Sequence, residues 1–247
     1  MPNMKIIAMI PARYGATRFP GKLMKDLGGK PVIVQTFEAV RATQLFEDVY
    51  VVTDNDRIEQ AIIEVGGKVI RSKREYQSGS DRLAEACESM NVDVVVNIQG
   101  DEPFTAKKNL EMLIEIFEKD TDNQVDVATL MEELYDFEDI KNPNNVKVVT
   151  NNSGDALYFS RACIPFPRDE KSLGNYFKHI GIYAYRKPAL IQFSQLEESM
   201  LETTEKLEQL RYLENGFKIR VAKTDIPTIG IDTESDLEKA RKIWNSL

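Results

Sequence analysis

The sequence predicts an α/β protein whose first half is doubly wound around a parallel sheet and whose second half adds antiparallel strands. Strand-like and helix-like patterns alternate through the first hundred residues. The run at 92–98 has an unbroken Val94-Val95-Val96 centre, which is typical of a parallel strand covered on both faces. Beyond residue 120 several strand-like runs follow one another closely, which indicates antiparallel additions. The predicted sheet is therefore mixed and mostly parallel.

In the first half, each element follows from a local pattern. The apolar run at 5–10 predicts the first strand, and Pro31 suits the first turn of a helix at 31–43. Gly66-Gly67 ends the next helix, and Ser78-Gly79-Ser80 precedes the one after it. The other predicted elements of the first half are strands at 48–53, 68–72 and 92–98 and helices at 58–65 and 81–90.

In the second half, helix patterns again alternate with short apolar runs. Leu207, Leu210 and Leu213 form one stripe of a helix that Gly216 ends. Thr233 and Asp236 fit a capping box at the start of the closing helix. The expected helices are 110–118, 188–196, 204–215 and 234–244, and the expected strands are 125–130, 146–150, 156–160, 180–185 and 217–221.

Length and composition suit one ordinary globular domain over 1–247. Hydrophobic residues make up 42% of the 247 positions and charged residues 29%, with no repeat or flexible linker. The apolar runs are too short to cross a bilayer and no export signal is recognisable, so we expect no membrane insertion and a cytoplasmic protein. Cys87 and Cys163 lack C-x-x-C spacing, which argues against a disulfide framework or a structural zinc site.

Charge is unevenly distributed along the chain. The totals are 32 basic and 40 acidic residues, a net charge of −8, which disfavours a nucleic-acid partner. The first thirty residues nevertheless hold six basic residues against Asp26 alone. This local excess predicts a small anionic ligand near the N-terminus.

The loop at 11–22 is the candidate anion site. It lacks G-x-G-x-x-G, and five residues separate Gly15 from Gly21 where a P-loop has four, which argues against a kinase-type P-loop. Arg13, Arg18 and Lys22 could surround a polyphosphate, or they could simply be a solvated basic loop. The position after the first strand favours a ligand site, since open α/β sheets bind ligands at the carboxyl ends of strands.

Two acidic residues are candidate magnesium ligands. Asp101 follows the strand at 92–98 beside Gly100, and Asp232 precedes the closing helix. Only the fold can bring these two residues together. Asp54-Asn55-Asp56 also matches the D-x-D pattern of metal-dependent glycosyltransferases, although a helix start is the favoured interpretation.

For three polar residues of the second half, the sequence pattern alone favours a structural or solvent-facing role over a functional one. His179 is the only histidine, and alone it is more typical of a structural or hydrogen-bonding role than of a catalytic base. Glu208 and Gln209 lie off the leucine stripe, where side chains normally face solvent.

Seven segments in order over nearly the whole chain carry a resemblance. They are the run 10–22, Gln77-Ser78-Gly79-Ser80-Asp81-Arg82, the run 99–103, Ala156-Leu157-Tyr158-Phe159-Ser160-Arg161, Lys178-His179-Ile180-Gly181-Ile182-Tyr183, the run 207–211 and Gly230-Ile231-Asp232-Thr233. Together they resemble the 3-deoxy-manno-octulosonate cytidylyltransferases, or CMP-KDO synthetases. The resemblance implies a three-layer, Rossmann-like nucleotidyltransferase fold, a homodimer, magnesium dependence and a role in lipopolysaccharide biosynthesis. It also implies transfer of CMP from CTP to the anomeric hydroxyl of 3-deoxy-manno-octulosonate (KDO), with release of pyrophosphate.

The resemblance further implies roles for individual residues. Lys22, Asp101 and Asp232 would be catalytic, and the two aspartates would hold Mg²⁺. CTP would be bound by Pro11, Ala12, Arg13, Arg18, Lys22, Ser78, Gly79, Gln99 and Gly100. The sugar acid would be bound by Gln99, Arg161, His179, Tyr183, Glu208 and Gln209. Dimerisation and sugar binding would fall within about 150–215.

The sequence departs from the family pattern at three places, so rival functions stay open. Tyr76 stands where the family usually has histidine, Ser80 replaces threonine, and Glu234-Ser235 replaces Pro-Glu. Tyr76 keeps open a cytidylyltransferase for a related sugar acid, such as 8-amino-KDO or a nonulosonate. Two further possibilities are a glycosyltransferase using Asp54-Asn55-Asp56 and a catalytically silent nucleotide-binding regulator.

Overall fold

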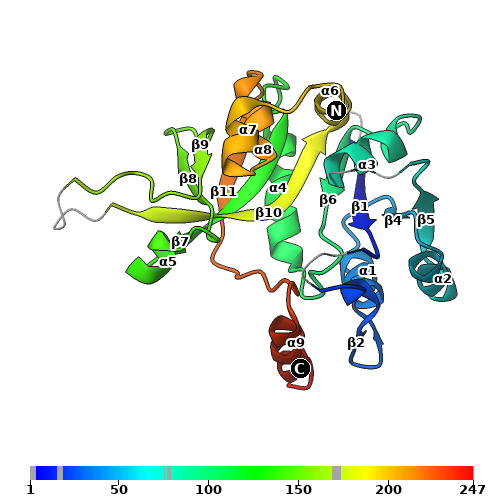
Figure 1. The fold of residues 1–247 in the computed structure, drawn as a ribbon. Coiled ribbons are helices and arrows are strands. Elements are labelled where there is room, and N and C mark those ends of the chain that lie inside the picture. The colour runs from blue at the N-terminus through cyan, green and yellow to red at the C-terminus, as the bar shows by residue number, and fades with distance from the viewer. Residues whose placement is uncertain (1–3, 16–18, 75, 77–78, 169–173, 247) are drawn as a thin grey trace. The chain divides into compact units, whose positions relative to one another are not determined.

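The computed structural model describes residues 4–15, 19–74, 76, 79–168 and 174–246 (Figure 1). The chain divides into two compact units, one formed by Met1–Leu110 with Thr228–Leu247 and the other by Glu111–Pro227. The first unit is therefore discontinuous in sequence. A single domain over 1–247 stays a prediction.

The first unit is built on four parallel strands. These are β1 (Ile6–Ala12), β4 (Val49–Thr53), β5 (Lys68–Arg71) and β6 (Val94–Asn97), in the order β6-β1-β4-β5. β1 and β6 are almost entirely buried, as the unbroken valine run predicts. The parallel part of the predicted sheet is confirmed.

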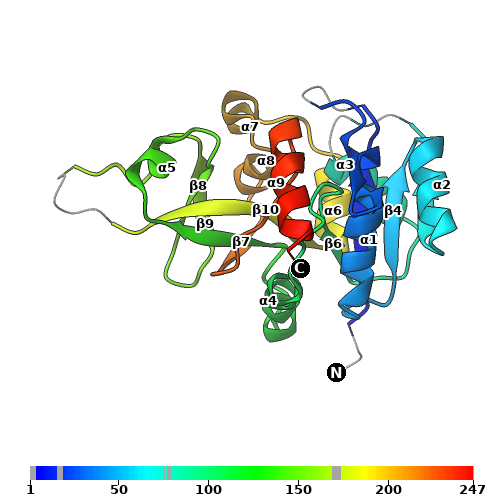
Figure 2. The ribbon, with the colours of Figure 1, turned by 90° about the horizontal axis from the view of Figure 1, so that it is seen from below.

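Helices and a short hairpin complete this unit. They are the 3₁₀ turn η1 (Lys22–Met24), the strands β2 (Asp26–Leu27) and β3 (Lys30–Pro31), and the helices α1 (Val32–Ala42), α2 (Asp56–Glu64), α3 (Gly79–Cys87) and α9 (Glu234–Trp244). α3 returns from β5 to β6, against the direction of the α1 and α2 crossovers, so right-handed connections place it on the opposite face. In Figure 1 the β1 arrow points down toward α1 and α9, and Figure 2 views the molecule from that end.

The second unit carries the antiparallel strands. β7 (Val127–Leu134) pairs in parallel with β11 (Ile219–Lys223) and antiparallel with β10 (Tyr176–Arg186), and β10 pairs with β8 (Lys147–Thr150), which pairs with β9 (Ala156–Ser160). Its helices are α5 (Phe137–Lys141), α6 (Lys187–Phe193), α7 (Met200–Glu205) and α8 (Gln209–Glu214), and α4 (Lys107–Lys119) crosses the division between the units in sequence. The predicted mixed sheet is confirmed.

The predicted helix at 204–215 is wrong. The chain forms α7 and α8 instead, and Lys206 ends α7 in the left-handed conformation with φ 54°. Arg211 of α8 reaches back to the Glu202 carboxylate through two hydrogen bonds of 2.6 Å, and both side chains are buried. This ion pair requires the break, and it outweighs the helical pattern of the leucines. Gln209 is consequently buried rather than solvated.

The closing helix α9 has the predicted bounds and capping box. Thr233 Oγ1 accepts from the Asp236 amide at 3.2 Å, while Asp236 accepts from the Thr233 amide at 3.0 Å. The other end of α9 is anchored, because Arg241 donates to the Asp26 carbonyl at 2.9 and 3.1 Å. Among the described residues, no helix combines the length and the apolar character needed to span a membrane.

Gly28 allows α9 to pack against the β2–β3 turn. Its φ is +62°, and a Cβ there would lie 2.1 Å from Trp244 Nε1. Gly29 has a similar φ of +84° but open space around it. Gly29→Ala therefore introduces backbone strain alone, whereas Gly28→Ala adds a steric clash.

We expect both substitutions to lower the free energy of unfolding. The loss for Gly29→Ala should be about 1 kcal/mol from left-handed strain, and overpacking against Trp244 should add about 1–3 kcal/mol for Gly28→Ala. Urea unfolding of the two variants checks this. Equal losses would show that Trp244 does not constrain the turn.

Candidate functional site

Lys22 is placed by a tight loop after β1. Gly21 turns the chain with φ +67°, and its amide donates to the Tyr14 carbonyl at 3.2 Å. A Cβ at Gly21 would come within 3.3 Å of the Tyr14 ring, so glycine allows this close approach. Gly21 is therefore held beside Tyr14, and Lys22 follows at the first position of η1.

Asp101 and Asp232 converge on the Lys22 ammonium. Lys22 Nζ donates to Asp101 Oδ2 and, at 2.9 Å, to Asp232 Oδ1. The Asp101 side chain is 19% exposed and that of Asp232 50% exposed. The structure thus brings together the three residues that the resemblance assigns to catalysis, all within the first unit.

A backbone hydrogen bond explains how Asp232 reaches the other two residues. The amide of Ile231 donates to the Asp101 carbonyl at 3.0 Å, and the Ile231 side chain is fully buried. The segment before α9 is thereby fixed to the loop that follows β6. Asp232 lies next to this anchor and Asp101 is part of it.

The charge balance keeps Lys22 a cation. Burial alone would lower the pKa of the Lys22 ammonium, but the Asp101 and Asp232 carboxylates outweigh burial and hold that pKa above its usual value. The same two carboxylates fit a divalent cation, since their oxygens already face one positive charge. Within the described ranges, no cluster of three or more acidic, histidine or cysteine side chains could hold a metal. A magnesium ion here would therefore also need phosphate oxygens or water.

The neighbouring backbone forms a close-packed platform. A Cβ at Gly100 would lie 3.3 Å from the Pro11 carbonyl oxygen, and one at Gly79 would lie 3.5 Å from Pro11 Cγ. Thr36 Oγ1 donates to the Gly100 carbonyl at 2.9 Å. Three segments predicted to bind CTP therefore meet around Pro11.

The other residues predicted to bind CTP are located by their burial and their position in the chain. Arg13 is exposed on the loop after β1, Ala12 is buried, and Gln99 is partly exposed between β6 and Gly100. Arg18 and Ser78 lie outside the described residues.

Each residue of the D-x-D tripeptide has a structural partner. Asn55 caps α2 by accepting from the amides of Arg57 and Ile58 at 3.1 and 3.3 Å. Asp54 pairs with Arg82 at 2.9 Å and Asp56 with Arg71 at 2.6 Å. These contacts favour the helix-start interpretation.

In the second unit, His179 and Tyr183 flank an irregularity in β10. The register with β7 shifts between Ile180 and Tyr183, and buried Thr129 lies opposite. Thr129 Oγ1 lies 3.0 and 2.9 Å from the Ile180 and Ile182 carbonyls and 3.1 Å from His179 Nε2. Since a hydroxyl has one proton and a carbonyl can only accept, His179 Nε2 is the donor to Thr129. This leaves His179 Nδ1 as an acceptor.

His179 lies between two aromatic rings and is held neutral by burial. Its ring lies 5.1 Å from that of Phe159 and 5.2 Å from that of Tyr183. Burial, with a smaller effect of the Lys178 charge, lowers the pKa of His179 to about 3. Burial also raises the pKa of Tyr183 well above its usual value, with Tyr185 and the Glu208 charge contributing. Both rings are neutral at physiological pH.

Arg161, Glu208 and Gln209 lie around the end of α7. Arg161 donates from Nε to the Glu205 carbonyl at 2.7 Å and from Nη2 to that of Lys206 at 3.3 Å. Glu208 and Gln209 begin α8 just beyond this turn. Arg161 therefore holds the turn that presents Glu208.

Thr129 and Glu102 lie beside predicted site residues, although the sequence pattern gives neither of them a role. Thr129 orients His179, but a threonine in a strand gives no signal of this role. Glu102 follows Asp101, and burial together with the Asp101 charge raises its pKa to about 8. Its Oε2 is buried and has no hydrogen-bond partner in the described part of the chain.

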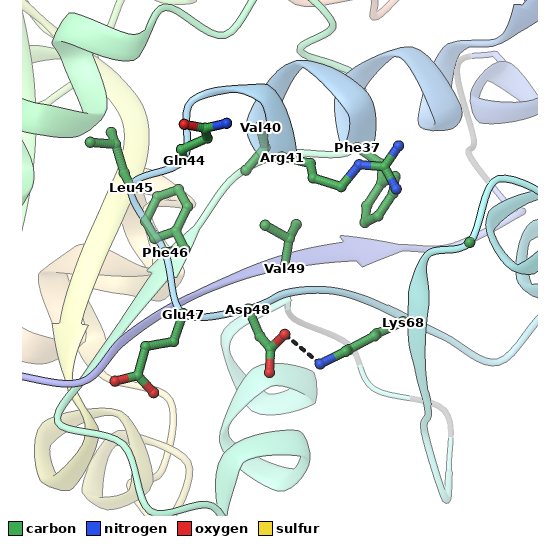
Figure 3. Close-up of a pocket in the computed structure, with 11 residues that line it drawn as sticks. Phe37, Val40, Arg41, Gln44, Leu45, Phe46, Glu47, Asp48, Val49 and Lys68 are labelled. Atoms are coloured by element: carbon green, nitrogen blue, oxygen red, sulfur yellow. Dashed lines mark hydrogen bonds and ion pairs between the residues drawn. The ribbon is translucent and has the colours of Figure 1, made fainter.

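A pocket of about 160 Å³ lies elsewhere in the first unit (Figure 3). It lies at the start of β4, the opposite end from Asp54, and Lys68 pairs with Asp48 on its wall. None of the predicted site residues lines it.

A Rossmann-like sheet with a cation and two carboxylates at its carboxyl edge is the architecture of a nucleotidyltransferase. The sequence profile of a family described as cytidylyltransferase matches residues 7–219. Relatives named 3-deoxy-manno-octulosonate cytidylyltransferase are 56% identical in Flavobacterium johnsoniae, over 99% of this chain and 100% of the relative, and 55% identical in Christiangramia forsetii, over 97% and 96%. The chain belongs to this cytidylyltransferase family and is a nucleotidyltransferase enzyme.

A solved structure agrees with this family. It is that of a CMP:2-keto-3-deoxy-manno-octonic acid synthetase complexed with CTP, with a TM-score of 0.92 and 41% identity. The match covers 98% of this chain and 99% of that one. The nucleotidyltransferase fold implied by the sequence resemblance is confirmed.

We expect His179 to remain neutral from pH 8 to pH 5. The pKa of the His179 ring is lowered in the folded chain but is near 6.5 in the unfolded chain. Between pH 8 and pH 5 this ring therefore takes up a proton only in the unfolded state. The free energy of unfolding should thus fall as the pH drops below about 6.5, and His179→Asn should remove that part of the fall. Because the chain has one histidine, its ring signals in proton NMR are unambiguous. A titration near pH 6.5 in the folded protein would contradict the burial of His179.

Proposed function

We propose that this enzyme transfers CMP from CTP to the anomeric hydroxyl of KDO, giving CMP-KDO and pyrophosphate. The observation that carries the proposal is the convergence of Asp101 and Asp232 on Lys22, in a chain 56% identical over nearly its full length to a KDO cytidylyltransferase. Bringing two anionic substrates together requires neutralisation of negative charge, and this cluster is built around a cation.

In the proposed reaction, the sugar hydroxyl oxygen bonds to the α-phosphorus of CTP. The bond from that phosphorus to the bridging β-oxygen breaks, pyrophosphate leaves with the electron pair, and the hydroxyl proton is released. No protein nucleophile is needed. The chain's contribution is to bind and align the two substrates and to neutralise charge on the phosphate oxygens.

Lys22, Asp101, Asp232 and two arginines of the N-terminal loop each have a proposed role. Arg13, Arg18 and Lys22 bind the phosphates, with Lys22 remaining charged because its pKa is raised. Asp101 and Asp232 hold Mg²⁺, which when bound neutralises charge on the triphosphate. Before ligands arrive, Lys22 compensates the repulsion between the two carboxylates and keeps them close.

Nucleotide contacts are proposed for a further set of residues. Gly79, Gly100 and Pro11 belong to three segments that approach one another closely, which supports a common role in holding the nucleotide. The full proposed set adds Ala12, Ser78 and Gln99.

The sugar acid is proposed to bind through Gln99, Arg161, His179, Tyr183, Glu208 and Gln209. The guanidinium of Arg161 suits the sugar carboxylate. A neutral His179 with an acceptor at Nδ1, and a protonated Tyr183, suit sugar hydroxyls, since neither ring adds charge.

The wider setting is part of the same proposal. The enzyme would work in the cytoplasm, in lipopolysaccharide biosynthesis, as a homodimer whose contact falls within about 150–215. Leu157 and Phe166, which are 61% and 82% exposed, are apolar side chains in that range that a partner could cover.

A related sugar acid is the second candidate substrate. Tyr76, which replaces the family's usual histidine, carries the Arg74 guanidinium 4.9 Å from its ring centroid. A guanidinium therefore lies beside the position where the family usually has histidine. Specificity constants for KDO, 8-amino-KDO and a nonulosonate would identify the preferred acid.

We expect pyrophosphate release from CTP, Mg²⁺ and KDO, and a large loss of kcat/KM for Asp101→Asn and Asp232→Asn. The loss should be on the order of 100-fold or more, since each carboxylate supports the metal. Glu234→Gln removes an exposed charge two residues from Asp232 and should retain activity. Near-normal rates in either aspartate variant would remove its metal role.

Chelation provides an independent test. EDTA should abolish pyrophosphate release and added Mg²⁺ should restore it, because two carboxylates alone bind a divalent cation reversibly. Far-UV circular dichroism should be unchanged by EDTA. Full activity in EDTA would contradict a magnesium-dependent reaction.

A further inference from the structure

A buried arginine, Arg82, contacts the segment proposed to bind CTP. Arg82 is the fourth residue of α3 and is only 4% exposed. Charged side chains are almost never this deeply buried unless they are paired. The partners of Arg82 therefore show what its charge is used for.

The Arg82 guanidinium joins the ends of two neighbouring strands. Nη1 donates to the carbonyl of Ala12, the last residue of β1, at 3.3 Å. Nη2 donates to Asp54 Oδ2 at 2.9 Å, and Asp54 directly follows β4. Ala12 is the register partner of Thr53, so the planar guanidinium bridges adjacent strands at the same level.

The same contacts fix the start of α3 against Pro11. A Cβ at Gly79, the first residue of α3, would lie in van der Waals contact with the Pro11 ring, and one at Gly100 would lie 3.3 Å from the Pro11 carbonyl oxygen. Arg82 follows Gly79 by one helical turn and holds the next residue of β1, Ala12. The backbone at Pro11 and Ala12 is thus fixed by Gly79, Gly100 and Arg82 together.

We propose that Arg82 and Asp54 are positioning residues of the nucleotide site, which hold the backbone at the end of β1 in the geometry that CTP needs. This rests on the proposed binding of CTP to Pro11, Ala12 and Arg13. Arg82 acts through Ala12 and Asp54 acts through Arg82. Neither side chain is a ligand of the nucleotide in this proposal.

Stability alone does not account for this pair. A well-packed apolar residue in place of a buried ion pair is often as stable or more stable. What the pair adds is direction, because a guanidinium with two planar donors fixes both the Ala12 carbonyl and the Asp54 carboxylate. Misplacement of the backbone should therefore weaken CTP binding more than it changes the chemical step.

The test uses Asp54→Asn and Arg82→Lys in the full chain. Asp54→Asn removes the charge and keeps the size, whereas Arg82→Lys keeps the charge and loses the planar donors. Asp56→Asn is the matched control, because it makes the same change two residues away in the exposed pair with Arg71. Calorimetry gives the dissociation constant of CTP with Mg²⁺, steady-state kinetics give KM and kcat, and circular dichroism gives the unfolding midpoint.

We expect Asp54→Asn and Arg82→Lys to raise the dissociation constant and KM for CTP by about tenfold or more, with kcat at saturating CTP within about threefold of wild type. Asp56→Asn should change neither constant. The double variant should have about the same dissociation constant for CTP as the single variant that binds CTP less tightly, because the two substitutions remove the same Arg82–Asp54 interaction.

The proposal is overturned if the variants lower the unfolding midpoint while their CTP affinity stays at the wild-type value. If Arg82→Lys does not fold, Asp54→Asn decides between the same two results. A wild-type protein that neither binds CTP nor releases pyrophosphate would instead refute the proposed function. A wild type that does both, with variants that bind CTP normally, would refute this inference alone.

Discussion

The ion pairs of Lys22 with Asp101 and Asp232 are the interaction on which the rest of the site depends. They join residues that are 79 and 210 positions apart from Lys22 in the chain. Two carboxylates this close repel each other in the absence of a cation, so the ammonium is a condition for their arrangement. Several backbone contacts of the first unit help to bring these three side chains to one point.

The fold achieves this through backbone contacts rather than through further charges. Gly21 closes the loop before Lys22, Thr36 fixes the Gly100 carbonyl, and the amide of Ile231 is bonded to Asp101. These contacts involve the ends of β1 and β6 and the approach to α9. Because each is a hydrogen bond of 2.9–3.2 Å to a buried or partly buried group, the polar edge of the sheet has a defined geometry.

Much of this arrangement can be predicted from the sequence, and the exceptions share a physical cause. The strand centred on Val94-Val95-Val96 and the capping box of Thr233 and Asp236 depend on local patterns, and both are confirmed. The break at Lys206 and the burial of Gln209 escape such patterns because a tertiary pairing, Glu202 with Arg211, overrides the leucine stripe. Asp54 belongs to a local tripeptide in sequence, whereas its partner Arg82 lies 28 residues away. The motifs identify Lys22, Asp101 and Asp232 as a set, but only the topology shows that they meet.

The discontinuity of the first unit has a consequence for synthesis of the protein. The ribosome completes Lys22 and Asp101 early, then makes all of Glu111–Pro227, and only afterwards adds Asp232 and α9. A nascent chain therefore carries the cation and one carboxylate without the second. The pair of carboxylates proposed to hold Mg²⁺ is complete only once the last segment has emerged and α9 has packed against the β2–β3 turn through Trp244.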